Sequence, residues 1–287
     1  MAVGLKLLNI EMRIFAIRGE LWAAYPAGMR FPDAFARCYP MRGGGKISWI
    51  LTALNKVHLD WLLTKKYRYS DLKQMPPLNQ DEQVAFFWPA ASRSVGRFYG
   101  YRVEKGVVTE YWKLATSKEE QQALSREAEN TTVAKELAKG AFRVPSCLGT
   151  ETRDGVLIVR YEALPPDVRA VPLDAQWRNR IACARRIVAD AGYQHGDFGW
   201  HNLKASGNEL WILDWEEMSK KLPRLTDEIS FETMAAHYNE GRPLEEVVKA
   251  LHKRYLGQGD EVLQAVSSMA KRRIAMGDAL LKMWSRP

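Results

Sequence analysis

The sequence HGDFGWHN at residues 195–202, followed by ILDWE at residues 212–216, is the most informative part of this chain. The first stretch has the pattern H-x-D-x-x-x-x-N, and a lone aspartate, Asp214, follows Asn202 by twelve residues at the end of an apolar run. A short polar hairpin is predicted between the two stretches. The pattern therefore predicts that Asp197, Asn202 and Asp214 place three oxygen-bearing side chains around one point.

Such a set has the residue types that phosphoryl transfer requires. A carboxylate, here Asp197, accepts the proton of an attacking hydroxyl, while an amide and a second carboxylate, here Asn202 and Asp214, hold magnesium on the phosphates. A carboxylate at the end of a buried strand is costly unless it binds a metal or a cationic partner. The alternative is a loop of turn-forming Asp and Asn residues that only caps the next element. The spacing of the three residues together favours the metal site.

A nucleotide-binding site also needs a cation on the phosphates and an anion that holds this cation. Lys113 lies in a predicted strand with apolar neighbours, and Glu127 lies on the helix that follows. We expect these two side chains to pair, because an apolar-flanked lysine should have a partner. The alternatives are a solvated strand lysine and a surface helix charge, with Glu120 and Glu129 as competitors.

Two further segments are candidates for contact with a nucleotide. The turn ASRSVG at residues 91–96 is small and polar enough for its backbone amides to approach phosphates, and Ser92 and Ser94 lie in it. It lacks the pattern G-x-G-x-x-G, so an ordinary hairpin turn is an equal alternative. After the last predicted strand of this region, Tyr161 and Ala163 are expected to lie in a hinge whose backbone pairs with adenine.

The apolar pattern divides the chain into three regions. Residues 1–80 are predicted to form a basic, mostly helical extension, with an apolar stripe of helical spacing over residues 48–63. Residues 81–164 are rich in strands around one helix, which begins at a capping box, Ser117 to Glu120. Residues 165–287 are mostly helical. We therefore predict an α+β fold in which a small antiparallel-sheet lobe binds nucleotide and a larger helical lobe carries catalysis and substrate binding.

The positive charge of the chain is concentrated in its first region. Of a net charge of +8, residues 1–80 contribute a surplus of 7, with 12 Lys and Arg against 5 Asp and Glu. A basic segment favours an acidic partner. One interpretation is contact with an anionic membrane surface through residues 1–80, and the alternative is packing of the apolar stripe on the neighbouring lobe. No motif favours nucleic-acid binding.

The cysteine content and the first residues bear on localisation. Three cysteines without metal spacing fit a reducing compartment. Residues 5–17 are too short and too charged to span a bilayer. We therefore expect a cytoplasmic protein, either free or peripheral to the inner face of the membrane.

The stretch from His195 to Phe198 with Asn202, and the stretch from Leu213 to Glu216, resemble two motifs of the aminoglycoside phosphotransferase and choline kinase-like family. These motifs are H-G-D-x-x-x-x-N and I-D-W-E, and the family shares the protein-kinase-like fold. The similarity extends over roughly residues 85–240. It implies a bilobal kinase-like fold, ATP as the nucleotide with GTP as an alternative, Mg²⁺, and a small-molecule hydroxyl acceptor.

The resemblance also implies roles for individual residues. Asp197 would be the catalytic base, and Asn202 and Asp214 would hold magnesium. Lys113 and Glu127 look like the phosphate-binding lysine of the family and its partner on the helix.

Two further residues resemble positions that support the catalytic loop. Asp227 looks like an aspartate that begins a later helix and braces the loop. His195 is expected to support the same loop from within the motif.

The chain departs from the family in two places. Residues 199–201, Gly-Trp-His, stand where the family often has proline, and the segment of residues 165–193 is short for an aminoglycoside-binding insertion. The C-terminal region also has no acidic surplus that would bind a polycationic antibiotic. The sequence therefore predicts a kinase acting on a hydroxyl of a sugar, amino alcohol or glycan-lipid. The alternatives are a lipopolysaccharide- or protein-directed kinase, or an inactive nucleotide-binding scaffold.

Overall fold

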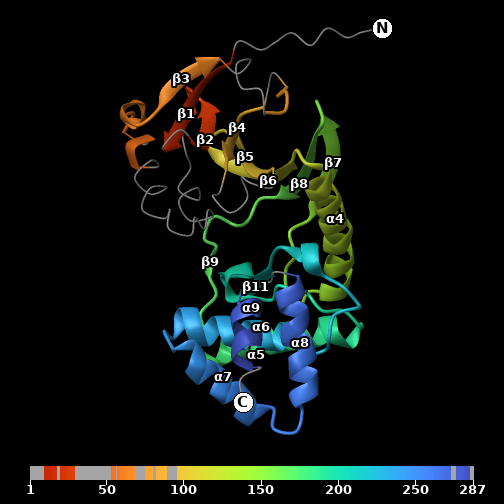
Figure 1. Ribbon diagram of the computed structural model, residues 1–287. Helices are drawn as coiled ribbons and strands as arrows, with labels where there is room; N and C mark the ends of the chain where they lie inside the picture. Colours follow the sequence, from red (N-terminus) through yellow and green to blue (C-terminus); the bar gives the residue numbers. More distant parts are fainter. Residues whose placement is uncertain are drawn as a thin grey trace. The chain divides into compact units, whose positions relative to one another are not determined.

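The computed structural model describes residues 10–17, 20–29, 53–55, 57–68, 75–79, 82–88, 96–272 and 276–284. The chain has a mixed α/β fold and divides into two compact units (Figure 1). Unit 1 comprises Met1–Arg126 and Ser146–Asp167, and unit 2 comprises Glu127–Pro145 and Val168–Pro287.

Unit 1 is built on one eight-stranded sheet whose neighbouring strands all pair antiparallel. The strand order is β3-β1-β2-β4-β5-β6-β8-β7, and Figure 1 shows the red and orange strands β1 to β4, the yellow strands β5 and β6, and the green strands β7 and β8. The strands are β1 (Glu11–Ile17), β2 (Glu20–Pro26), β3 (Lys65–Arg68), β4 (Val84–Phe87), β5 (Arg97–Glu104), β6 (Val107–Ala115), β7 (Cys147–Arg153) and β8 (Val156–Glu162).

Both faces of the central strands are apolar, because successive side chains of a strand point to opposite faces. On one face, Trp112 and Leu114 of β6 pack with Phe86 in one buried cluster. On the other face, Tyr101 and Phe87 belong to a second buried cluster. The sheet is therefore a central layer with a core on each side.

The prediction that residues 1–80 are mostly helical is wrong for the described residues. Strands β1, β2 and β3 lie in this region and extend the sheet, and β2 pairs with β4. Of the predicted helical stripe over residues 48–63, the described part is helical at residues 53–55 and in the 3-10 helix η1 (Asp60–Leu62), whereas Val57 is exposed. These strands depend on pairing partners far along the chain, which a local apolar period does not reveal.

The helix α4 (Lys118–Ala138) begins in unit 1 and continues in unit 2. Its N-terminus has the hydroxyl contact of the predicted capping box. The Ser117 hydroxyl accepts from the Glu120 backbone N–H at 3.3 Å, as predicted. The Glu120 carboxylate forms an ion pair with Arg97 at 2.7 Å, which ties the helix start to β5.

Unit 2 is mostly helical around a small antiparallel sheet of order β11-β10-β9. Its helices are α5 (Ala175–Asp190), α6 (Thr226–Met234), α7 (Leu244–Arg254), α8 (Gly259–Lys271) and α9 (Gly277–Trp284). Its strands and short turns are β9 (Arg169–Ala170), η3 (Trp200–Asn202), β10 (Leu203–Ser206), β11 (Glu209–Ile212), η4 (Trp215–Glu217) and the π-helical turn η5 (Ala235–Asn239).

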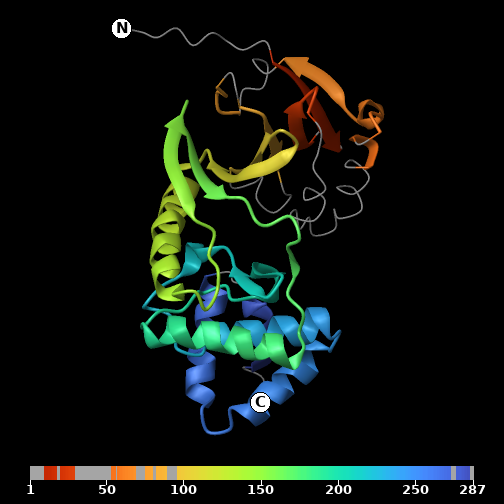
Figure 2. The ribbon, with the colours of Figure 1, turned by 180° about the vertical axis from the view of Figure 1, so that it is seen from behind.

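The helices of unit 2 position the segment of residues 195–216. Asp174 caps α5 by accepting from the Trp177 N–H at 3.0 Å, as the sequence predicts. The buried face of α5 packs in one cluster with Phe198 and Trp215, which belong to this segment. Figure 2 shows α5 as the blue-green helix that crosses unit 2 on the viewer's side. In the described part of the chain, no helix combines the length and apolar character needed to cross a bilayer.

Candidate functional site

The first turn of α6 fixes the loop that contains the H-x-D-x-x-x-x-N pattern. The Asp227 carboxylate accepts from the backbone N–H of His195 at 2.7 Å and from that of Gly196 at 2.8 Å. Gly196 has a φ of +93°, and a Cβ there would lie 2.7 Å from the backbone oxygen of Glu217. Burial raises the pKa of Asp227, while His195 and the two N–H groups oppose this rise. The loop thus passes through a place where only glycine fits, held by a buried carboxylate.

His195 connects this loop to the strand that precedes Asp214. Its Nδ1 accepts from the Asp197 N–H at 3.3 Å, so its Nε2 carries the proton and donates to the Leu213 carbonyl at 2.9 Å. The ring is fully buried, with its centroid 4.4 Å from that of Trp215. His195 therefore positions the backbones of Asp197 and Leu213 relative to one another.

The two oxygens of the Asp197 carboxylate have different surroundings. Oδ2 accepts from Asn202 Nδ2 at 3.2 Å and lies 3.2 Å from His201 Nε2. Asn202 Nδ2 also donates to the backbone oxygen of Asp197 at 2.9 Å, so the amide holds the loop closed. Oδ1 has no hydrogen-bond partner among the described residues. One oxygen is thus held in place, and the other is buried and has unused capacity to accept a hydrogen bond.

The sequence assigned no role to His201, although it lies within the quoted motif. A Cβ at Gly199 would lie 2.6 Å from His201 Cε1 and 2.7 Å from its Nδ1. Glycine at this position therefore leaves room for the imidazole beside Asp197. The sequence shows a glycine and, two residues later, a histidine. This spacing does not indicate that the imidazole lies beside Asp197, because that contact exists only in the folded loop.

Three carboxylates of unit 2 come together at the end of β11. Oxygens of Glu127, Asp214 and Glu216 all lie within 4.8 Å of one another. Asp214 adopts a left-handed backbone, with φ and ψ of 65°, at the start of η4. Asn130, one turn after Glu127 on α4, donates to the Trp215 carbonyl at 2.9 Å. This hydrogen bond places α4 against η4 and brings Glu127 to the cluster.

This donor set fits a hard divalent cation such as Mg²⁺, which binds carboxylate oxygens. Like charges at such short separation also favour a bound cation. The sequence predicted Asn202 and Asp214 as metal ligands, and their backbones are adjacent, because the Leu213 N–H donates to the Asn202 carbonyl at 3.0 Å. The structure adds Glu216 and Glu127 to Asp214. Glu216 was missed although it stands two residues after Asp214, because a tight turn after a strand brings such neighbours together only once folded.

In unit 1, the described candidates lie on neighbouring strands of the sheet. Lys113 is buried on β6, opposite Tyr99 of β5 and Val159 of β8. Tyr161 lies near the end of β8, opposite Tyr111. Lys113 and Glu127 belong to different units, so their expected pairing stays a prediction.

The remaining nucleotide-contact candidates lie at the ends of this region. Ala163 directly follows β8. Ser92 and Ser94 fall outside the described residues. Gly96, the last residue of the expected turn, has a φ of +82°, and a Cβ there would lie 2.6 Å from the Thr116 hydroxyl oxygen. The glycine is therefore required by the close approach of Thr116, which directly follows β6.

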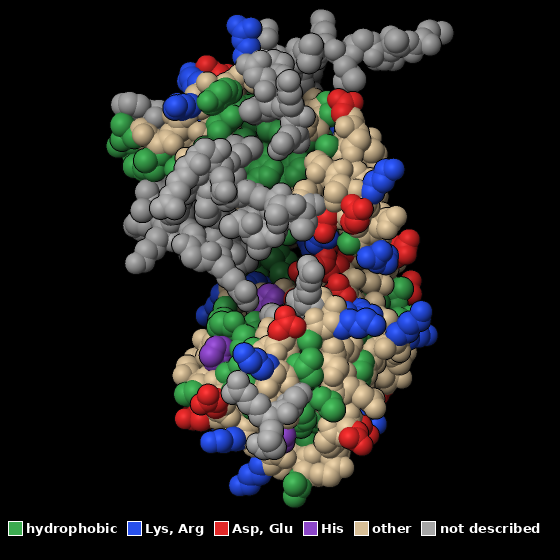
Figure 3. Space-filling view, in the orientation of Figure 1, with side chains coloured by type: hydrophobic (Ala, Val, Ile, Leu, Met, Phe, Trp, Pro, Cys, Tyr) green, Lys and Arg blue, Asp and Glu red, His purple; other side chains and the backbone are tan. Residues whose placement is uncertain are grey.

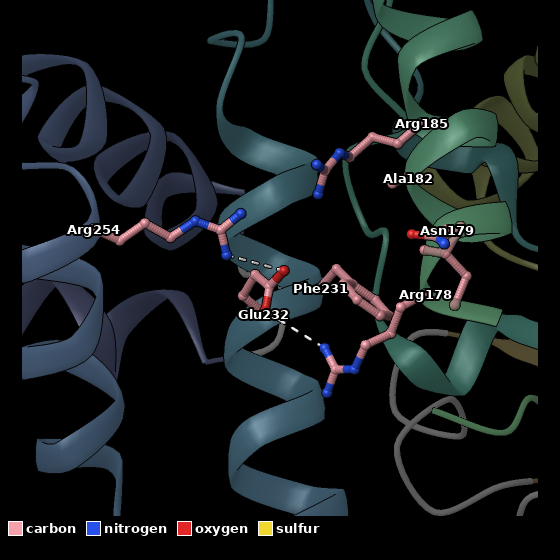
Figure 4. A pocket seen from close by; sticks show the side chains of 8 residues that line it. Arg178, Asn179, Ala182, Arg185, Phe231, Glu232 and Arg254 are labelled. Carbon is pink, nitrogen blue, oxygen red and sulfur yellow. Dashed lines mark ion pairs between the residues drawn. The ribbon is translucent and has the colours of Figure 1, made fainter. Parts of the chain in front are cut away.

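A pocket of unit 2 lies between α5, α6 and α7 (Figure 4). Arginine side chains converge on it, and Glu232 lies 3.8 Å from Arg178 and 3.2 Å from Arg254. Arg185 pairs with Glu228 at 3.1 Å. Because each of these arginines already has a carboxylate partner, the pocket is an ion-pair network that joins three helices, and we assign it no substrate.

The comparisons with known proteins do not identify the chain. No protein-family model matches the sequence, and no curated protein matches it. Similar solved structures include a crystal structure of WbdD, with 14% identity, a TM-score of 0.39, and coverage of 64% of this chain and 47% of that chain. A structure of monomeric WbdD has 13% identity, a TM-score of 0.35, and coverage of 69% and 46%. The chain thus spans about half the length of these structures, and superpositions this loose assign neither a fold family nor a function.

Proposed function

We propose that this chain is an ATP- and Mg²⁺-dependent phosphotransferase of kinase-like fold that transfers the γ-phosphate to a hydroxyl of a small molecule. The observation that carries the proposal is the Asp197 carboxylate. One of its oxygens is held by Asn202 and His201, and the other has no hydrogen-bond partner among the described residues. A general base for a hydroxyl needs this combination of fixed orientation and free accepting capacity.

The carboxylate cluster supports the second half of the proposal. Glu127, Asp214 and Glu216 offer oxygen ligands that suit Mg²⁺, with the Asn202 backbone beside them. Magnesium at this place would supply neutralisation of the charge on the phosphates. Lys113 would bind the phosphates of the nucleotide through its ammonium group.

In this proposal the protein contributes alignment and electrostatics and makes no covalent intermediate. Asp197 orients the acceptor hydroxyl and takes its proton as the phosphoryl group departs from the nucleotide. Asp227 and His195 support this role, because they fix the backbone N–H groups of the loop up to and including that of Asp197.

The acceptor class follows from charge and chemistry. A sugar, an amino alcohol or a glycan-lipid offers a hydroxyl without the strong positive charge of an aminoglycoside. Residues 165–287 hold 18 Lys and Arg against 17 Asp and Glu, so this region has no acidic surplus for a polycation. An inactive scaffold is disfavoured, because a chain without catalysis has no need of Asp197, Asn202 and Asp214 together.

The test is a nucleotide-consumption screen against sugars, amino alcohols, glycolipids and aminoglycosides with wild-type protein and Asp197→Asn. With an accepted substrate, we expect the variant to lose a factor on the order of 10² to 10⁴ in rate while keeping its fold. Asp260→Asn, at an exposed aspartate at the start of α8, is the matched control and should keep its rate. Near-full turnover by Asp197→Asn would remove Asp197 from this role.

A further inference from the structure

A short segment of unit 1 exposes apolar side chains in unusual density. Ten large apolar side chains are exposed in the described parts of the chain, and half of them lie between residues 57 and 67. Their exposed fractions range from 41% to 62%, and the residues are Val57, Leu59, Leu62, Leu63 and Tyr67. Residues 57–68 are named the apical segment here. Its apolar side chains are too numerous and too close together for scattered surface residues.

The same segment presents positive charge beside these apolar side chains. Lys65, Lys66 and Arg68 are exposed on β3, the edge strand of the sheet. Lys66 pairs with Glu11 at 2.7 Å, whereas neither Lys65 nor Arg68 has an ion-pair partner among the described residues. Figure 3 shows green and blue side chains together over this part of unit 1.

The one acidic residue of the apical segment is turned inward. Asp60 is 4% exposed, and its carboxylate accepts from the Tyr25 hydroxyl at 2.6 Å and from Asn55 at 3.4 Å. Arg13 lies 3.4 Å from the same oxygen, and the Thr64 hydroxyl donates to the Asp60 backbone oxygen at 2.9 Å. These contacts hold the acidic side chain inside the turn, so that the exposed side chains of the segment include apolar groups and cations but no acid.

We propose that the apical segment is a binding surface for an anionic membrane. Apolar side chains interleaved with Lys and Arg suit the headgroup region of a bilayer, where the apolar groups enter and the cations meet lipid phosphates. Lysine is depleted at protein interfaces, so an apolar surface with Lys beside it fits lipid better than a protein partner. Pairing of two β3 edges from two copies of the chain is opposed by their like charges. The inference does not depend on phosphotransfer.

The test is co-sedimentation of the full chain with vesicles. One vesicle preparation is phosphatidylcholine alone, and the other is phosphatidylcholine mixed with phosphatidylglycerol. We expect binding to the anionic vesicles and a loss of binding at high salt, since screening weakens exposed charges. The double variant Lys65→Glu/Arg68→Glu should lower the partition coefficient at least about 25-fold, at roughly fivefold for each cation.

A second double variant, Leu62→Ser/Leu63→Ser, separates the apolar part from the charge and should also reduce binding by at least about tenfold. The matched control is Leu256→Ser/Lys253→Glu, because Leu256 is 89% exposed in unit 2 and Lys253 is exposed beside it. The control should bind as the wild type does, and thermal unfolding should show that all three variants are folded.

Several results would overturn the proposal. One is failure of the wild type to bind anionic vesicles at low salt. Another is equal binding by the wild type and by both apical variants. A third is a wild-type dimer that the apical variants convert to monomer without any vesicle binding, which would assign the surface to a second copy of the chain.

Discussion

Two regions of this molecule are each organised around one buried aspartate, and they use it for opposite purposes. In unit 2, Asp227 accepts two backbone N–H groups and fixes the loop of residues 195–202 with its polar atoms directed to the candidate site. In unit 1, Asp60 accepts from Tyr25 and Asn55 and fixes the apical segment with its apolar atoms directed outward. A buried aspartate therefore fixes the candidate site in one unit and an exposed surface in the other.

The donors differ, and this decides how strongly each region depends on its aspartate. The donors to Asp227 are backbone N–H groups, whose direction is fixed by the loop. The donors to Asp60 are side chains, and Asn55 has a second acceptor in the Met29 backbone oxygen at 3.1 Å when the carboxylate is removed. Burial and the bond to Asp60 raise the pKa of Tyr25, so this phenol stays a donor at any ordinary pH.

Replacing Asp227 by Ala should have the largest effect. Two buried N–H groups would lose their acceptor, at a combined loss of about 2–5 kcal/mol in the free energy of unfolding. The loop around Asp197 would also lose its brace, so activity should fall even where the protein remains folded. Urea unfolding and turnover with the same preparation measure both effects. Unchanged stability would mean that the loop is held by other contacts.

Replacing Asp60 by Ala should have a smaller effect on stability, about 1–3 kcal/mol, because its side-chain donors can relax. The apical segment would lose its fixed turn, so vesicle binding should weaken while turnover on a soluble acceptor remains. A loss of turnover equal to that of Asp227→Ala would contradict the different roles of the two aspartates, since it would make Asp60 a determinant of the loop of residues 195–202.

The pH dependence of stability should have opposite signs in the two units. The raised pKa of Asp227 means that its contribution is present below the ordinary value of 3.8 and is lost as pH rises through the raised pKa. Burial alone would raise the pKa of Glu82 in unit 1, but hydrogen bonds from Arg153 and Asn79 outweigh it and lower the pKa. The contribution of Glu82 is therefore present above 4.5 and is lost as pH falls through the lowered pKa.

The measurement is urea unfolding of the wild type, Asp227→Asn and Glu82→Gln over a range of acidic to neutral pH. The stability difference between wild type and Glu82→Gln should grow as pH rises, and that between wild type and Asp227→Asn should shrink. If both stability differences grew with pH, or both shrank, burial would not be the dominant influence on the pKa of Asp227.

Replacing His201 should have the smallest effect. His201→Ala removes one of two contacts to Asp197 Oδ2, which is worth about 1 kcal/mol or roughly a fivefold loss in kcat. His201→Gln should recover part of this loss, because an amide can donate to the same oxygen, and the KM for nucleotide should stay constant. Gly199→Ala should act in the same direction by displacing the imidazole. A change in KM without a change in kcat would place His201 in binding.

The sequence predicted some of these features well because they are local. The spacing of Asp197 and Asn202 implies a closed loop, and the structure joins the two side chains directly. The cap of α5 at Asp174 and the mostly helical character of residues 165–287 followed from local patterns as well.

Features that depend on residues far apart in the chain were not predicted from the sequence. The strand β2 pairs with β4, which lies about sixty residues later in the chain. The hydrophobic pattern of β2 itself therefore does not reveal its place in the sheet. The burial of Asp60 depends on Tyr25, which lies 35 residues earlier. Glu216 joins Asp214 and Glu127 only because the chain turns sharply at a left-handed residue after β11.

The central claim is that Asp197 acts as the base and that Asp214 belongs to a magnesium site. The most direct measurement is the affinity for ATP, determined by calorimetry with and without Mg²⁺ in the wild type, Asp197→Asn and Asp214→Asn. Phosphoryl transfer is measured with the same three preparations. The account predicts that Asp197→Asn keeps Mg²⁺-dependent binding while losing phosphoryl transfer, and that Asp214→Asn loses the Mg²⁺ dependence itself. Equal binding by all three proteins, with or without Mg²⁺, would contradict it.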